Sequence, residues 1–215
     1  IIDWSFNQYG AKLISINNKD IKKQKRIFEE IWTAQLILTL LSIFISILMS
    51  IVWYKYKLIF IYFNLTLIGN FLQPFWFLNG LEKIYESAIL QLINKIFLTI
   101  FIFLFITPSS EISAYFLIFG YSYLISGSFY QLRLKGIYKK RIYLSSFSKG
   151  YKILEKSLNL YVSSVFASLV NTSLPLIINY LIGSTNLGIY NVADRIKGIC
   201  SQLTNPISHA LFPRM

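Results

Sequence analysis

Cysteine and histidine are almost missing from this sequence, which has one of each in 215 residues. A single cysteine, Cys200, cannot form a disulfide within the chain. With one histidine, His209, it also cannot supply the clustered thiolate and imidazole ligands of a zinc site. The glycine-containing stretch 183–188 lacks the Lys-Ser/Thr that would make it a phosphate-binding loop. We therefore predict no metal site, no cofactor and no catalytic residue.

Charge is also scarce. Charged residues make up 14% of the chain, whereas a soluble globular chain carries about 25%. Hydrophobic residues make up 55%, the mean hydropathy is +0.54, and the apolar residues come in long unbroken runs. These features indicate an all-α integral membrane protein with one membrane domain and no soluble insert.

The uncharged run 31–54 is long enough to cross a bilayer. The segment between Trp32 and Trp53 would measure about 31 Å at about 1.5 Å per residue, which matches the hydrocarbon thickness. Tryptophans at both ends are typical of membrane interfaces. Further spans are predicted at 58–81, 87–107, 112–132, 157–182 and 190–213, with residues 1–16 as the end of an earlier helix.

Basic residues gather in every second connector. Segment 17–30 has five Lys/Arg, segment 133–156 has eight, and the short turn 82–86 contains Lys83. The connectors between them, 55–57, 108–111 and 183–188, hold two lysines together. This alternation predicts that the basic connectors are cytoplasmic. It also explains the basic run near Lys22 as a lipid-contacting loop, so we predict no nucleic-acid partner.

One lysine, Lys95, interrupts the apolar run 87–107. Ser87, Gln91, Lys95 and Thr99 recur every four residues, so they share one helix face. A charge at the centre of a membrane helix costs about 2.5–3.5 kcal/mol, and such residues tend to face a bundle interior or water. The alternative is that the long lysine stem reaches back to the headgroups. The polar stripe favours an interior cavity.

Three other segments carry polar stripes at helical spacing. In the first, Ser5, Gln8, Lys12 and Ser15 place a second lysine among polar neighbours. Residues 157–175 carry a stripe of hydroxyls that includes Asn171, and small polar residues at this spacing also serve as helix-packing seams. The last stripe, within 191–208, contains Asp194, and Arg195 lies beside it on another face.

Four stretches resemble the motifs of a known membrane family. They are "PFWFLNGLEK" (74–83), "SFNQYGAKLIS" (5–15), "LGIYNVADRIKG" (187–198) and "NPISHALFPRM" (205–215). The first resembles the Pro-x-Trp-Phe-Phe-Gln-Gly-x-Glu signature of bacterial polysaccharide transporters of the O-antigen flippase (Wzx-like) type. Leu78 and Asn79 depart from the usual Phe and Gln, but the spacing is kept.

The resemblance implies a polytopic helix bundle of the MATE-like superfamily. The chain would run from the end of helix two to helix eight of a twelve-helix transporter. Residues 1–156 would belong to the N-terminal lobe, and 157–215 would form the first helices of the C-terminal lobe. Because the sequence does not begin with Met, we expect it to be a piece of a longer protein.

The same resemblance implies a function and a set of site residues. Such proteins translocate undecaprenyl-pyrophosphate-linked oligosaccharides, the O-antigen or capsule repeat units, across the bacterial inner membrane by alternating access. The expected partners are this substrate, the lipid bilayer and other polysaccharide-assembly proteins. The substrate-binding residues would be Lys12, Lys95, Arg195, Gln8, Gln91 and Asn171. Asp194 is the candidate for coupling to protons or sodium.

Three alternatives stay open at this stage. A cation-coupled multidrug exporter of the same superfamily should carry unpaired acidic residues in its spans, whereas the charges here are mainly basic. A membrane polysaccharide polymerase or ligase should have a long external loop, whereas the predicted external connectors are short. A fragment without activity is the third.

Overall fold

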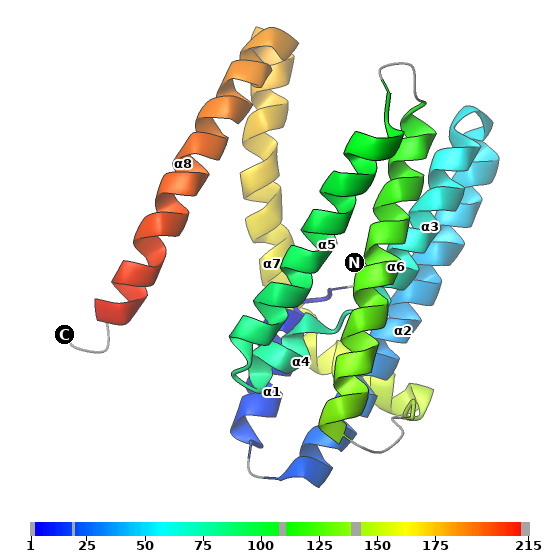
Figure 1. Cartoon of the computed structure of the whole chain (residues 1–215), viewed down its shortest axis with the longest axis vertical. Coiled ribbons are helices and arrows are strands. Elements are labelled where there is room, and N and C mark those ends of the chain that lie inside the picture. Colours follow the sequence, from blue (N-terminus) through cyan, green and yellow to red (C-terminus); the bar gives the residue numbers. More distant parts are fainter. Residues whose placement is uncertain (1–2, 19, 108–110, 139–142, 212–215) are drawn as a thin grey trace. The chain divides into compact units, whose positions relative to one another are not determined.

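Every element of the computed structural model is a helix over the described residues, which are 3–18, 20–107, 111–138 and 143–211 (Figure 1). The side chains of Tyr138, Asn171 and residues 199–211 are not part of that description. In chain order the elements are α1 (Phe6–Ile16), α2 (Ile21–Val52), the 3₁₀ turn η1 (Tyr54–Tyr56), α3 (Lys57–Phe71), α4 (Phe75–Gly80), α5 (Ile84–Phe105), α6 (Ile112–Tyr138), α7 (Phe147–Ile182) and α8 (Ser184–Leu211).

The chain divides into two compact units. The first covers Ile1–Tyr161 and the second Val162–Met215, so the division falls inside α7. This division by contacts does not test the predicted lobes 1–156 and 157–215, which remain a prediction about the longer transporter.

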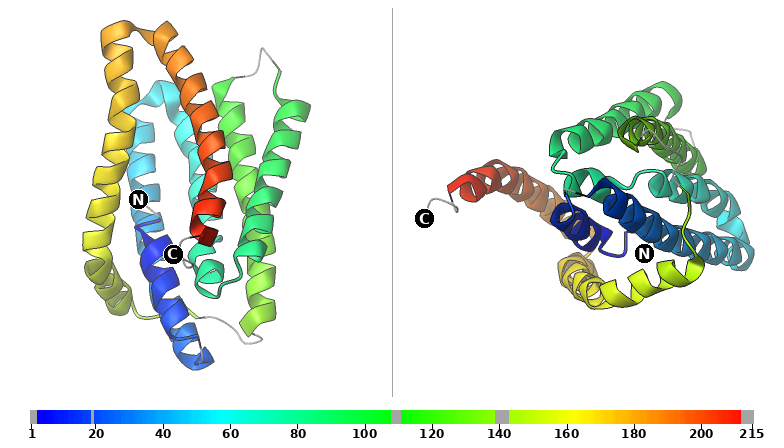
Figure 2. Two further views of the ribbon diagram at one scale, coloured as in Figure 1. Left: turned by 90° about the vertical axis from the view of Figure 1, so that its left-hand side faces the viewer. Right: turned by 90° about the horizontal axis from the view of Figure 1, so that it is seen from below.

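Within the first unit, α3 lies between α2 and α6, α5 packs on the other side of α6, and α1 packs against α4 and α2 (Figures 1 and 2). The α3–α6 seam is close because glycines face it. A Cβ on Gly69 would lie 2.6 Å from Tyr123 Cβ, and one on Gly120 would lie 2.6 Å from Leu65 Cβ. Small residues of this kind let membrane helices approach backbone to backbone.

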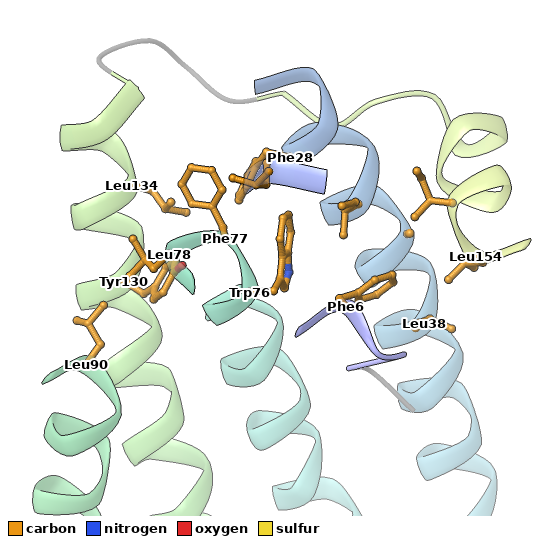
Figure 3. Packing of buried hydrophobic residues seen from close by; sticks show 14 residues of the cluster. Phe6, Phe28, Leu38, Trp76, Phe77, Leu78, Leu90, Tyr130, Leu134 and Leu154 are labelled. Atoms are coloured by element: carbon orange, nitrogen blue, oxygen red, sulfur yellow. The ribbon is translucent and has the colours of Figure 1, made fainter. Parts of the chain in front are cut away.

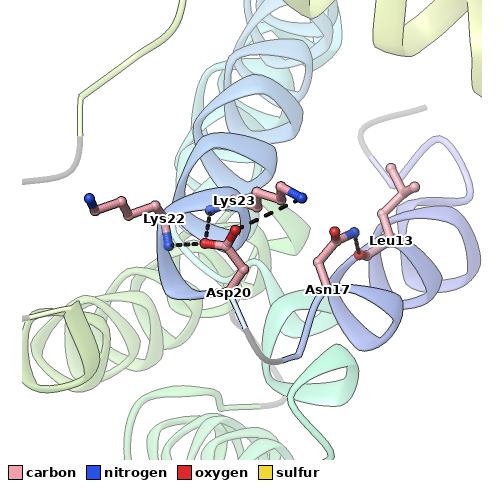
Figure 4. A network of polar contacts seen from close by, with 5 residues as sticks. All are labelled: Leu13, Asn17, Asp20, Lys22 and Lys23. Atoms are coloured by element: carbon pink, nitrogen blue, oxygen red, sulfur yellow. Dashed lines mark hydrogen bonds and ion pairs between the residues drawn. The ribbon is translucent and has the colours of Figure 1, made fainter.

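The basic segment before the first predicted span is helical. We predicted a connector over 17–30, but α2 already begins at Ile21. Asp20 caps it, since its carboxylate accepts hydrogen bonds from the backbone N–H groups of Lys22 and Lys23 at 3.0 and 3.1 Å (Figure 4). Ion pairs at i, i+4 spacing, such as Arg26–Glu30 at 3.1 Å, add support along the first turns.

The predicted span 58–81 is not one helix. It is interrupted between α3 and α4 at Leu72–Pro74. Proline has no N–H to donate, and its ring clashes with the carbonyl four residues earlier, which belongs to Asn70. That carbonyl accepts instead from the N–H of Gln73 at 3.0 Å. The short helix α4 then holds the stretch that resembles the transporter signature.

Each backbone carbonyl at this interruption receives a hydrogen bond. Trp32 Nε1 donates to the Phe71 carbonyl at 3.4 Å, and Gln131 Nε2 donates to Leu72 at 2.8 Å. The Gln73 carbonyl accepts from the Phe75 N–H at 2.7 Å. The Tyr130 hydroxyl donates to the Pro74 carbonyl at 2.6 Å. Irregular backbone at membrane depth requires partners of this kind, because lipid offers none.

A buried hydrophobic cluster surrounds α4. Trp76, Phe77 and Leu78 are almost fully buried there, and Figure 3 shows Trp76 amid side chains from neighbouring helices. Phe28 stacks on Trp76 with ring centroids 5.5 Å apart, and Trp76 Nε1 donates to the buried Gln35 Oε1 at 3.4 Å. The other members of the cluster are Phe6, Ile14, Ile31, Ala34, Leu38, Leu90, Tyr130, Leu134, Ile153 and Leu154.

Within the first unit, the start of α2 and the turn between α4 and α5 lie at the opposite end from η1 (Figures 1 and 2). At one end, Arg133 Nε and Nη2 donate to both carboxylate oxygens of Glu86 at 2.7 and 2.6 Å. There the Thr33 hydroxyl also accepts from the Ser145 N–H at 2.8 Å. At the other end, η1 and the start of α6 line a common pocket. This arrangement agrees with the predicted alternation, while the side of the membrane that each end faces stays a prediction.

Within the described residues, five helical segments are long and apolar enough to cross a membrane, namely Ile21–Val52, Tyr54–Gly80, Ile84–Phe105, Ile112–Ile137 and Phe147–Ile182. Large apolar side chains such as Ile96 and Phe103 are exposed on them, as lipid-facing residues are. The chain is therefore a partial polytopic membrane helix bundle, as predicted. The predicted span 190–213 overlaps α8 up to Leu211, and its last two residues lie outside the described part of the chain. Because α8 is not among the five, its crossing stays a prediction.

Candidate functional site

The first predicted lysine, Lys12, lies on the outward face of α1. Gln8, Lys12 and Ser15 are exposed, whereas Phe6, Gly10 and Ile14 on the opposite face are buried. The Ser15 hydroxyl donates to the Lys12 carbonyl at 2.9 Å. Within the described residues the Lys12 ammonium has no ion-pair or hydrogen-bond partner, so its charge is available to a ligand.

The second predicted lysine, Lys95, lies on α5 within the predicted stripe. Ser87 is buried and accepts a hydrogen bond from Gln91 Nε2 at 3.4 Å. The Thr99 hydroxyl donates to the Lys95 carbonyl at 2.8 Å. Gln91, Lys95 and Thr99 are exposed. In the part of the chain that the structure describes, the Lys95 ammonium also makes no ion pair or hydrogen bond.

A pocket of about 300 Å³ lies beside Lys95. It is lined by Phe75 of α4, by Gln91, Asn94, Lys95 and Leu98 of α5, and by Phe119 and Tyr123 of α6. The structure thus brings two predicted site residues, Lys95 and Gln91, to one pocket. An ammonium, two amides and aromatic rings are chemically suited to an anion that carries sugar hydroxyls.

The pocket lies on the packed side of α5. Residues 91, 94, 95 and 98 share a helix face with Ser87 and Leu90, and both of these are buried in the unit. The exposed apolar residues Leu92, Ile96 and Phe103 occupy a different face. Because Lys95 itself is exposed, its orientation toward the interior or along the lipid stays a prediction.

One pocket residue, Asn94, escaped the sequence analysis. Its side-chain oxygen is buried and has no hydrogen-bond partner in the part of the chain that the structure describes. The signal was an asparagine next to the lysine in the run "LQLINKIFL", one position off the four-residue stripe. The predicted stripe contained only residues four apart. Residues three apart on a helix also share a face, so Asn94, three after Gln91, belongs to it.

The remaining predicted site residues belong to the second unit. Asp194 and Arg195 are exposed on α8. The side chain of Asn171 in α7 lies outside the described residues. The structure therefore does not bring these three residues together with Lys12 or Lys95, and the binding and coupling roles assigned to them stay predictions.

A larger pocket, of about 410 Å³, lies between α2 and α3. It is mostly apolar, but Asp3, Ser42, Ser46 and Asn70 contribute polar groups. Both Asp3 carboxylate oxygens accept from Asn7 Nδ2, at 3.1 and 3.0 Å. Among the described residues, no group of three or more His, Cys, Asp or Glu could hold a metal ion.

Comparison with known proteins decides the family. The family model described as polysaccharide biosynthesis protein matches residues 1–215, the whole chain. The chain belongs to this polysaccharide biosynthesis family. The predicted resemblance to the Wzx-like transporters is thereby confirmed at the level of the family.

A curated relative of this family member is a protein of Escherichia coli (strain K12) named "Putative O-antigen transporter". The two are 21% identical over 221 residues, which cover 100% of this chain and 52% of the relative. The chain thus spans about half the length of the curated relative that it matches. No solved structure matches it significantly.

The family and its relative bear on the alternatives. The relative's name is that of a transporter and not of a polymerase or ligase. The family description places the chain in polysaccharide biosynthesis, while the substrate stays a prediction. The MATE-like arrangement of twelve helices stays a prediction.

Proposed function

We propose that the full-length protein translocates an undecaprenyl-pyrophosphate-linked oligosaccharide, an O-antigen or capsule repeat unit, across the bacterial inner membrane. The lipid tail stays in the bilayer while the polar head passes between the two lobes by alternating access. Family membership, the transporter name of the relative and the five described helices that are long and apolar enough to cross a membrane support this proposal. Other polysaccharide-assembly proteins are its expected partners.

One observation carries the proposal, namely that Lys95, on an otherwise apolar helix, lines a pocket together with two amide side chains and has no ion-pair partner among the described residues. A lysine at this depth costs about 2.5–3.5 kcal/mol on insertion scales. A structural lysine would recover part of that cost through an acidic partner. Lys95 has none within the described residues, and it shares its pocket with Gln91. An anionic ligand such as a pyrophosphate would supply the missing counter-charge.

The other predicted residues take complementary roles in this proposal. Lys12 and Gln8 would offer a second basic and amide surface on the exposed face of α1. Arg195 and Asn171 would contribute from the second lobe, and Asp194 would bind the coupling proton or sodium ion. Each role predicts reduced export from the alanine variant at normal protein level.

The test replaces Lys95 in the full-length protein. Lys95→Ala and Lys95→Arg are expressed in a strain that lacks its own copy of the transporter, and surface polysaccharide is measured against the protein level in the membrane. We expect Lys95→Ala to lower export at least about tenfold, since loss of one charge-assisted contact costs about 1.5–3 kcal/mol. Lys95→Arg should retain most of the export, because arginine keeps the positive charge.

Lys22→Ala is the matched control. Lys22 is also exposed and without a side-chain partner in the described residues, but it lies at the end of the bundle, in the first turn of α2. Its variant should export normally. Normal export from Lys95→Ala would refute the proposed role of the pocket.

A further inference from the structure

The two lysines of the predicted external connectors lie at one pocket. Among the connectors 55–57, 108–111 and 183–188, the basic residues are Lys55 and Lys57. External connectors of membrane proteins usually contain few basic residues, so two lysines at one place require a local reason. Both line a pocket of about 690 Å³, within the size range of ligand sites. Its other lining residues are Tyr54, Tyr56, Leu58, Ile59, Ile61, Glu111, Ile112 and Ser113.

The two ammonium groups lie over aromatic rings. Lys55 Nζ is 5.7 Å from the centre of the Tyr56 ring. Lys57 Nζ is 5.6 Å from the centre of the Tyr54 ring. Cation–π contacts of this kind attract an ammonium to the ring, but they do not neutralise its charge. Among the described residues neither lysine forms an ion pair, so both charges are available to an anion.

Glu111 is the acidic residue of the lining. Its carboxylate accepts a hydrogen bond from the Ser113 hydroxyl at 3.0 Å. Two lysines against one glutamate leave the lining with a positive net charge. The pocket therefore favours an anion, and Glu111 weakens that preference without reversing it.

Apolar side chains adjoin the charged ones. Leu58 and Ile61 of α3 and Ile112 of α6 line the same pocket and are exposed. Tyr54 and Tyr56 are exposed as well, and aromatic residues at the end of a span are typical of the membrane interface. A ligand here would meet cations at one side and hydrocarbon at the other, as the headgroup and acyl chains of a phospholipid do.

We propose that this pocket binds an anionic phospholipid, such as phosphatidylglycerol, in the leaflet at the η1 end of the bundle. The lipid phosphate accepts from Lys55 and Lys57, and the acyl chains lie along Leu58 and Ile61. A soluble anion would leave these apolar side chains in water, and a zwitterionic lipid would bring its own cation to a positive lining. The inference does not depend on the proposed function, because none of these residues lines the Lys95 pocket.

The experiment compares two lipids at a tryptophan placed in the lining. Ile61→Trp is introduced into the full-length protein, which is purified into phosphatidylcholine nanodiscs containing a minor share of brominated phosphatidylglycerol or brominated phosphatidylcholine. Bromine on the acyl chains quenches tryptophan fluorescence on contact, and the signal is the emission that Ile61→Trp adds to the parent. We expect phosphatidylglycerol to bind about fivefold more tightly, since each lysine near the membrane surface adds about that factor and Glu111 offsets one.

Charge variants of the lining should change this preference in opposite directions. Lys55→Gln combined with Lys57→Gln should lower it at least about fivefold, so that no preference for phosphatidylglycerol remains. Glu111→Gln should raise it about fivefold, because it removes the opposing charge. If the double variant does not accumulate in the membrane, Glu111→Gln alone decides the question.

Lys22→Gln is the matched control. Lys22 is exposed in the first turn of α2, at the end of the first unit opposite η1 (Figures 1 and 2). Its variant should change the preference by less than about twofold. Equal quenching by both lipids overturns the lipid site. So does a preference that survives loss of both lysines, an equal loss in Lys22→Gln, or no rise in Glu111→Gln.

Discussion

Two polar regions of the first unit, the helix interruption at Leu72–Pro74 and the Lys95 pocket, are built in opposite ways. At the interruption, Trp32 and Gln131 donate to the carbonyls of Phe71 and Leu72, and Tyr130 adds a second donor to the Pro74 carbonyl. In the pocket, the Lys95 ammonium and Asn94 Oδ1 have no partner among the described residues. The backbone carbonyls of the first region are paired within the protein, although the side-chain oxygen of Gln73 there has no partner among the described residues.

The comparison separates structural from ligand-binding polarity. Unpaired oxygens alone do not make a site, because Ser42, Asn64, Thr66 and Gln73 also carry one. Asn94 differs in that it lines a pocket with an unpaired cation. We therefore expect substitutions around the interruption to destabilise the protein, and substitutions in the pocket to change binding and export with little effect on folding.

The largest loss of stability should follow Trp76→Ala. Trp76 is 1% exposed, stacks on Phe28 and donates to Gln35, so its removal leaves a cavity and an unpaired amide. We expect about 3–5 kcal/mol of destabilisation, measured as a lower unfolding temperature of the purified full-length protein. Trp53, which is 57% exposed, is the control, and Trp53→Ala should cost far less. Equal losses would contradict the central place of α4.

A smaller loss should follow Gly69→Ala. The added methyl would lie 2.7 Å from the Tyr123 carbonyl carbon, so α3 and α6 must move apart at a cost of about 1–3 kcal/mol. Gly188 offers a matched control, because its Cβ would meet no atom within 4 Å. Gly188→Ala should be neutral or slightly stabilising, since alanine favours helix. An unchanged unfolding temperature for Gly69→Ala would argue against the close seam.

The smallest of these losses should follow Tyr130→Phe. It removes the donor to the Pro74 carbonyl, but that oxygen still accepts from the Phe77 N–H at 3.0 Å. We therefore expect about 1 kcal/mol, within the range of hydrogen bonds measured in membrane proteins. Tyr115→Phe serves as a control, because Tyr115 is partly exposed on the same helix. A shift no greater than that of the control would show that the interruption does not depend on this bond.

Hydrophobic runs predicted most of the fold. Five of the six complete spans coincide with helices apolar enough to cross a membrane, because a lipid environment leaves the backbone little choice but a helix. The sequence did not predict that the helix is interrupted at Leu72–Pro74. Proline within a membrane helix is often only a kink, and the donors that stabilise a full break come from residues distant in sequence, such as Gln131.

The sequence predicted some of the residues that line the Lys95 pocket and missed others. The four-residue spacing of Gln91 and Lys95 placed them on one face, and the structure brings both to one pocket. Asn94 and Tyr123 were not predicted, since no sequence pattern says which side of a polar stripe is enclosed by another helix. The roles of Lys12, Arg195, Asn171 and Asp194 remain predictions for the full-length protein.

The sequence by itself determined that this chain is a helical membrane protein, which connectors are basic and where a lysine enters an apolar helix. These properties follow from local composition and helical period, which need no knowledge of neighbours. Only the tertiary structure decided that Lys95 lies beside a pocket and that Asn94 has no donor. Whether a polar group is satisfied depends on which other helix lies within hydrogen-bond distance, and that depends on the packing of the whole unit.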